Sequence, residues 1–144
     1  MMKGLIKAIL VLCFLSGCQM LGAEQDIRPM QLSQNAVIDQ EYADEAKKII
    51  LSMEEVVEIK GVSQKTDIYL APRVKHFDRF RLKEIRKYGY DSVKKRYPDA
   101  TVHVSTDQKI FMELEKLEQE LKNKTISEER MEKKLKKLDE MMKG

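Results

Sequence analysis

The amino-acid sequence predicts an α+β domain, in which a small three-stranded sheet carries helices on one face in the order αββαβα, followed by a C-terminal helical extension. Apolar residues recur at helical spacing in four segments, and three short runs rich in β-branched residues lie between them. The length of 144 residues is that of one domain, and the hydrophobic fraction of 42% is enough for a small core. With six glycines, three prolines and two cysteines, the composition excludes collagen-like, low-complexity and disulfide-rich classes.

The predicted α+β domain occupies residues 39–122, and its first helix runs from about Asp39 to about Glu55. The apolar residues of this helix are three or four positions apart, which is the spacing of one helix side. They are Ala43, Ala46, Ile50, Met53 and Val57. Lys47 and Lys48 lie off this apolar stripe.

Two strands are predicted to follow as a hairpin. β-branched residues favour a first strand over 56–62, broken around Gly61, and a second strand over 68–71. Residues 63–67 join the two strands. Because proline lacks an N–H group, Pro72 is expected to mark the end of the second strand or an edge position.

A second helix is predicted over 78–97, and a third strand over 101–105. The helix has Leu82, Ile85, Gly89 and Val93 along its apolar side. Gly89 weakens it by roughly 1 kcal/mol relative to alanine. The third strand follows from the alternation of valine with polar residues.

Two capping boxes predict the starts of the last two helices. Ser105 with Gln108 opens the third helix, and Thr125 with Glu128 opens the fourth. The third helix has Ile110, Leu114, Leu117 and Leu121 on one side; the fourth has Met131, Leu135, Leu138 and Met142. Residues 123–144 are therefore expected to form a hairpin with the preceding helix.

Residues 1–17 are typical of a lipoprotein signal peptide. Lys3 and Lys7 form a basic start, and eight uninterrupted apolar residues, 8–15, follow. Eight residues are too few to span a bilayer as a helix. Cleavage after residue 17 removes Cys13 together with the signal.

The apolar run ends in a motif that resembles the bacterial lipobox, Leu15-Ser16-Gly17-Cys18. The small residues allow an extended backbone to enter a peptidase groove, and the Cys18 thiolate can accept a diacylglyceryl group. Residues 18–38 are then the lipidated cysteine and a flexible tether. We therefore expect a protein anchored on the extracytoplasmic face of the cell membrane, since several acyl chains give stable attachment.

Four motifs spread over residues 1–122 carry a family resemblance. They are the lipobox, Ala43-Asp44-Glu45-Ala46, Lys60-Gly61-Val62 with Ile68-Tyr69-Leu70-Ala71, and Val102-His103-Val104-Ser105-Thr106-Asp107 before a helix. Together they resemble the YhcN/YlaJ family of sporulation lipoproteins of endospore-forming bacteria. The Glu- and Lys-rich helices after Leu121 depart from that family's pattern.

The resemblance implies a lipoprotein of the spore or forespore membrane, with a role in sporulation, germination or outgrowth and no established catalytic activity. Its fold is similar to BON-type domains, small αββαβ modules of envelope proteins that bind phospholipid or partners, by analogy alone. Cys18 is the one position to which the resemblance gives a chemical role.

A basic segment spans residues 73–96. It holds ten Lys or Arg residues against three Asp or Glu residues, with four aromatic residues interleaved. Beside anionic headgroups each cation adds about 1 kcal/mol of attraction, so the segment favours contact with an anionic surface. The candidate contact residues are Arg79, Arg81, Lys83 and Lys87. A solvated helix face is the alternative, and export argues against nucleic acid.

No residue pattern predicts an enzyme, a cofactor or a metal site. His76 and His103 are the two histidines, and no H-E-x-x-H spacing is present. His103, Ser105 and Asp107 are close in sequence, but they lack a nucleophile elbow. The expected partners are the membrane and an envelope protein or anionic lipid, with no small-molecule substrate. A small envelope hydrolase remains an alternative.

Overall fold

The computed structural model describes residues 28–33 and 36–144. Within these ranges the helices are α2 (Glu41–Leu51), α3 (Leu82–Arg96), α4 (Gln108–Lys122) and α5 (Glu128–Lys143), and a 3₁₀ helix, η1, spans His76–Arg81. The strands are β1 (Val56–Gln64), β2 (Asp67–Val74) and β3 (Thr101–Val104). The α+β class with a three-stranded sheet and a C-terminal helix is thus confirmed.

The sheet is mixed, with the order β1-β2-β3. β1 and β2 form the predicted antiparallel hairpin, and β3 pairs with β2 in parallel. A parallel pair needs a crossover connection, which η1 and α3 provide. β2 is therefore the central strand, and β1 is an edge strand.

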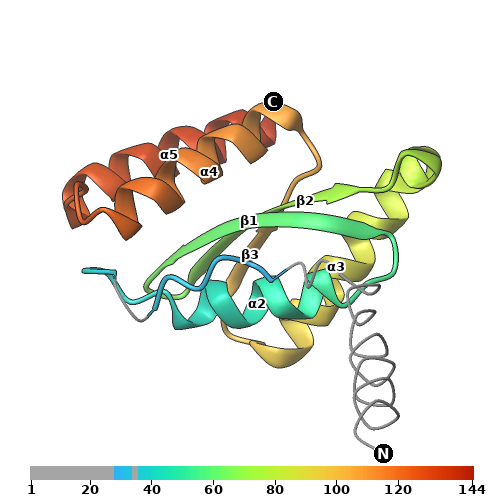
Figure 1. Cartoon of the computed structure of the whole chain (residues 1–144), viewed down its shortest axis with the longest axis horizontal. Helices are drawn as coiled ribbons and strands as arrows, with labels where there is room; N and C mark the ends of the chain where they lie inside the picture. Colours follow the sequence, from blue (N-terminus) through green and yellow to red (C-terminus); the bar gives the residue numbers. More distant parts are fainter. Residues whose placement is uncertain (1–27, 34–35) are drawn as a thin grey trace, which may run out of the picture.

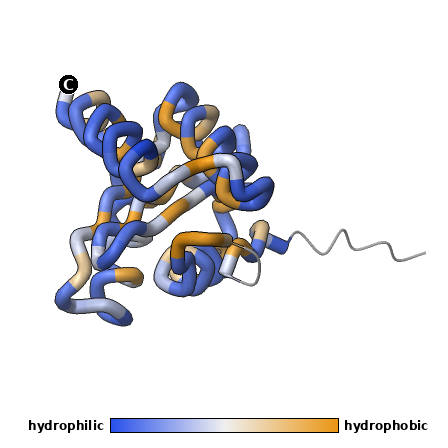
Figure 2. The backbone as a smooth tube through the Cα atoms, turned by 90° about the vertical axis from the view of Figure 1, so that its left-hand side faces the viewer, coloured by the Kyte–Doolittle hydropathy of each residue, from blue (hydrophilic) through white to orange (hydrophobic). Residues whose placement is uncertain are grey.

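Helices cover both faces of the sheet, not one face as expected (Figure 1). Successive β2 residues point to opposite sides: Ile68 and Leu70 pack with α2 and α3, whereas Tyr69 and Ala71 pack with α4 and α5. A central strand with apolar residues at successive positions needs cover on both faces. Along the helices the chain changes repeatedly between hydrophilic and hydrophobic residues, as required for helices with one buried side (Figure 2).

β2 continues through Pro72 to Val74, beyond the expected end. Pro72 lies opposite Ile59 of β1, and β3 pairs with β2 only as far as Leu70. At Pro72 the side of β2 that faces β3 is therefore an unpaired edge. The N–H group that proline lacks would lie on this edge, so no ladder hydrogen bond is lost.

The predicted helix over 78–97 is divided in two. The 3₁₀ helix η1 has no buried residue, and the α-helix α3 begins only at Leu82. Gly89 lies against α2, where an added Cβ would be 3.3 Å from Ile50 Cδ1. The glycine thus permits a close approach of two helices as well as reducing helix propensity.

The last two helices lie side by side as a hairpin (Figure 1). Their caps differ from those predicted: Asp107 accepts hydrogen bonds from the backbone of α4, and Ser127 accepts one from the backbone of α5. Ser105 instead accepts from the Asp107 N–H group. Each helix therefore begins two residues later than its predicted capping box implied. The capping residues, Asp107 and Ser127, are of types that are common at helix N-termini.

Part of the expected tether belongs to the domain. Leu32 is 1% exposed and Ile38 is 7% exposed, and both lie in the core under α4 and α5. The interpretation of residues 18–38 as a flexible tether is wrong at Leu32 and Ile38, because isolated apolar residues without periodicity still pack into the core of the folded protein.

Gly61→Ala is expected to destabilise the domain by about 1–3 kcal/mol. A methyl group at this position would lie 2.7 Å from Leu70 Cδ2 and 2.9 Å from the carbonyl oxygen of Tyr69, and the backbone oxygen cannot move aside alone. Urea unfolding measures the loss.

Gly89→Ala is the matched control. The Cβ added at Gly89 would contact only side-chain atoms, those of Ile50 and Met53. The gain in helix propensity, about 1 kcal/mol, offsets the cost of displacing these side chains. Equal losses in the two variants would contradict this account of Gly61.

Candidate functional site

The most exposed part of the basic segment is residues 75–83, which we call the η1 tip. It protrudes where β2 leads into α3, at one end of the sheet (Figure 1). Phe77 is 86% exposed and Phe80 is 84% exposed. Four basic residues and one acidic residue lie in the same nine positions. The tip thus joins exposed aromatic rings to positive charge.

The structure separates the four candidate cations into two kinds. Arg81 contacts three carboxylates, with the guanidinium 3.2 Å from Glu84, 3.8 Å from Glu55 and 4.0 Å from Asp78. The hydrogen bond that Arg81 donates to Glu84 raises the pKa of the guanidinium. This side chain therefore contacts α3 and the connection between α2 and β1.

Lys87 also has a partner, Asp91, at 2.6 Å one helical turn away. Within the described ranges, by contrast, Arg79 and Lys83 are exposed and have no carboxylate within 4 Å. Lys75 is in the same situation. Within the η1 tip, the cations available to an external anion are thus Lys75, Arg79 and Lys83.

The chain enters the domain beside this end of the sheet. Arg28, Pro29 and Met30 line a pocket of about 360 Å³ together with Leu51, Val57, Glu58, Ile59, Lys60 and Arg73. Arg73 is two residues before the η1 tip, and the Lys75 N–H group donates to the Glu55 carbonyl just before β1. The arriving segment and the tip therefore share one end of the sheet.

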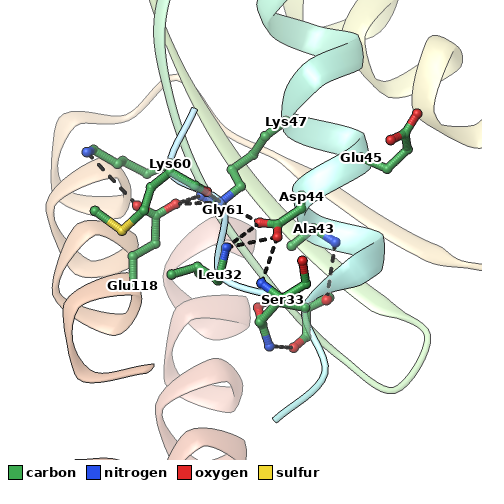
Figure 3. Close-up of polar contacts among 12 residues, drawn as sticks. Leu32, Ser33, Ala43, Asp44, Glu45, Lys47, Lys60, Gly61 and Glu118 are labelled. Carbon is green, nitrogen blue, oxygen red and sulfur yellow. Dashed lines mark hydrogen bonds and ion pairs between the residues drawn. The ribbon is translucent and has the colours of Figure 1, made fainter. Parts of the chain in front are cut away.

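A buried polar network holds the arriving segment in place (Figure 3). The Asp44 carboxylate accepts hydrogen bonds from the backbone N–H groups of Leu32, at 2.8 Å, and of Ser33, at 2.8 Å. Burial raises the pKa of Asp44, but these backbone hydrogen bonds and the charge of Lys47 outweigh it, so the pKa lies below 3.8.

Lys47 is fully buried and is the centre of this network (Figure 3). Its Nζ donates to the Met30 carbonyl at 2.5 Å and lies 3.1 Å from Asp44 and 3.2 Å from Glu118. A buried ammonium needs such partners, because its isolated transfer from water is very unfavourable. One side chain thus joins α2, α4 and the segment of residues 28–33.

Glu118 completes the network from α4. It is fully buried, and its Oε1 accepts from the Gly61 N–H group at 2.9 Å as well as from Lys47. Desolvation raises the pKa of Glu118 above 4.5 against the attraction of Lys47. Its Oε2 has no hydrogen-bond partner among the described residues and lies 4.0 Å from Lys60 Nζ.

Gln40 plays a similar part further along β1. Its side-chain amide donates to the Ser63 carbonyl at 2.6 Å and accepts from the Ser63 N–H group at 2.9 Å. Gln40 and Glu118 together satisfy outward-facing backbone groups of β1, as a further strand would. An edge strand covered in this way does not offer these groups for pairing with another chain.

The sequence interpretation missed this network. Lys47 lies off the apolar stripe of its helix, yet its side chain points into the protein. The available signal was Asp44 with Lys47 three positions later, each next to a small residue, Ala43 or Ala46. Glu118 gave no comparable signal, because its partners come from residues 71 and 57 positions away.

Of the remaining predicted residues, His76 lies within the η1 tip, His103 lies in β3, and Ser105 and Asp107 lie between β3 and α4. His103 stacks on Tyr69 with the ring centroids 4.4 Å apart, and its Nδ1 lies 3.5 Å from Asp139 of α5. His76 is exposed at the start of η1. Asp107 caps the start of α4, and the Ser105 hydroxyl accepts from the Asp107 N–H group, so both side chains serve the helix start although the cap is not the predicted one. Leu15, Ser16, Gly17 and Cys18 lie outside the described residues.

A pocket of about 700 Å³ lies between the end of α2 and α3, lined in part by Glu55, Arg81, Glu84, Lys87 and Asp91. These charged groups pair with one another. Across residues 28–33 and 36–144, no cluster of His, Cys, Asp or Glu has the arrangement of a metal site. Within the same residues no helix combines the length and the apolar character that crossing a bilayer requires.

Comparison of the chain with family models, with characterised proteins and with solved structures found no match. The resemblance to the YhcN/YlaJ family therefore stays a prediction from the quoted motifs.

Asp44→Asn is expected to destabilise the domain by about 1–3 kcal/mol near neutral pH, because it removes the charge that faces Lys47 and weakens the bonds to Leu32 and Ser33. The folded-state pKa of Asp44 is below its ordinary value of 3.8. Its stabilisation is therefore present above 3.8 and lost as the pH falls further. Urea unfolding at about pH 7 and about pH 3 is expected to show a smaller loss in acid.

Asp99→Asn, at an exposed position, is the control and should change the free energy of unfolding little at either pH. A loss for Asp44→Asn that is equal at both pH values would contradict the assigned role of its charge.

Proposed function

We propose that this chain is a non-enzymatic lipoprotein that Cys18 anchors at the extracytoplasmic face of the cell membrane. The observation that carries the proposal is the order of features before residue 19: two lysines, eight apolar residues and then Leu15-Ser16-Gly17-Cys18. Each part has the length and chemistry that lipoprotein export requires. The α+β domain then acts as a binding module held at the membrane.

The site of action is proposed to be the spore or forespore membrane, with a role in sporulation, germination or outgrowth. This part of the proposal rests on the resemblance to the YhcN/YlaJ family. The chain itself adds only closeness to the membrane that carries the anchor, since Arg28 follows Cys18 by ten positions. A chain of that length spans at most about 35 Å, so an anchored Cys18 keeps the domain next to the bilayer.

The second candidate function is that of a peripheral membrane-contact or assembly factor that uses the basic segment of residues 73–96. Arg79 and Lys83, which face solvent with no carboxylate close by in the described structure, favour it. This function does not require lipid on Cys18. The two candidates therefore differ in what removal of the cysteine does.

Cys18→Ala is expected to move the protein from the membrane fraction to unprocessed or soluble forms, because the acceptor of the lipid is lost. Fractionation of sporulating cells and purified spores, followed by immunoblotting of the wild type and the variant, measures this. Detection of the wild type in the spore membrane supports the proposed site of action.

Cys13→Ala is the matched control, since this cysteine is removed with the signal peptide and its loss should leave the membrane fraction unchanged. If Cys18→Ala behaves as the wild type does, the lipid anchor is wrong. A membrane signal found only in vegetative cells would retain the anchor and reject the spore role.

A further inference from the structure

Phe77 and Phe80 are the most exposed large hydrophobic residues of the described structure, at 86% and 84%. They are three positions apart in the 3₁₀ helix η1, a spacing at which side chains project from the same side. No residue of η1 is buried. Two aromatic rings thus project together from η1, at the end of the domain, and η1 itself contributes no buried residue to the core.

Single exposed hydrophobic residues are common, but two on one protruding turn indicate a partner surface. The charges around them indicate its chemistry. Lys75, Arg79 and Lys83 flank the two rings and lack a carboxylate within 4 Å among the described residues. Aromatic rings beside cations suit the headgroup region of an anionic bilayer, where apolar groups enter the acyl boundary and ammonium or guanidinium groups meet phosphates.

We propose that the η1 tip inserts Phe77 and Phe80 into the interface of an anionic lipid bilayer, while Lys75, Arg79 and Lys83 contact the headgroup phosphates. This inference rests on the proposed function in that the anchor at Cys18 brings the tip to the membrane. It goes further because it assigns a direct lipid contact and an orientation to the folded domain.

The arrangement of the chain supports this orientation. Residues 28–30 enter the domain beside Arg73, at the end of the sheet where the tip protrudes. The network of Lys47, Asp44 and Glu118 holds this entry point in place. Cys18 lies ten positions before Arg28, which allows about 35 Å at most. An anchor on this side brings the tip closer to the bilayer than the opposite end of the sheet.

The test uses tryptophan, which the chain does not contain. Phe77→Trp in the lipidated protein, placed in vesicles of phosphatidylglycerol and phosphatidylcholine, gives one fluorescent reporter in the tip. We expect its emission to shift to shorter wavelength and to be quenched by lipids brominated along the acyl chain. Val37→Trp is the matched control, because Val37 is 67% exposed and adjoins Ile38, which shares a pocket with the β1–β2 turn at the opposite end.

Arg79→Gln with Lys83→Gln, added to Phe77→Trp, tests the electrostatic part. Each cation contributes about fivefold, so the ratio of inserted to free tip is expected to fall about 30-fold. High salt should act in the same direction. Lys136→Gln with Lys137→Gln on α5 removes the same charge from exposed positions of another layer and should leave the ratio unchanged.

An unquenched, water-exposed indole in the membrane-attached Phe77→Trp variant would overturn the inference while leaving the Cys18 anchor intact. A shift that requires an added protein fraction would overturn it in favour of a protein partner. Equal insertion into pure phosphatidylcholine would reject the role of the cations. If Cys18 carries no lipid, the same measurement with excess vesicles still decides whether the tip inserts, so the two proposals can fail separately.

Discussion

The buried ammonium of Lys47 is the interaction on which the arrangement of this protein depends. It joins α2 to α4 through Glu118, and it joins α2 to the segment of residues 28–33 through the Met30 carbonyl. These elements come from both sides of the sheet and from the chain that precedes it. A buried cation is unstable without its partners, so the three elements must be in place together. The edge of β1 is covered as a consequence of the same contacts.

The same contact of Lys47 also fixes where residues 28–30 lie on the domain. The segment that leads back to Cys18 is attached to the edge of the sheet and leaves it beside Arg73. The open end of the β1–β2 hairpin, where Val56 pairs with Val74, leads into the η1 tip, and the turn lies at the opposite end. The entry point and the tip share one end of the sheet. Under the proposed anchor at Cys18, that end is the one nearer to the membrane, and the β1–β2 turn is the more distant one.

Much of the fold could be predicted because its signals are local. The stripe of Ala43, Ala46 and Ile50 predicted α2, and the β-branched runs predicted the hairpin and β3. The expectation that helices share one face failed, because periodicity shows that a helix has a buried side but not which face of a sheet receives it. The division of 78–97 into η1 and α3 was also missed, since the alternation of basic and aromatic residues continues across the boundary.

Patterns along the chain were enough to predict the α+β class and the order of the elements, both of which the structure confirms, and to show the surplus of basic residues after β2. The export motif ending in Cys18 stays a prediction from such a pattern. These follow from spacing and composition over a few neighbouring residues. Other features emerged only in the folded protein. Lys47 is buried, and Leu32 lies in the core. Arg81 is paired with carboxylates, whereas Arg79 and Lys83 face solvent. Burial and pairing of charges depend on residues distant in the chain, and their partners exist only once the sheet and both helical layers have come together.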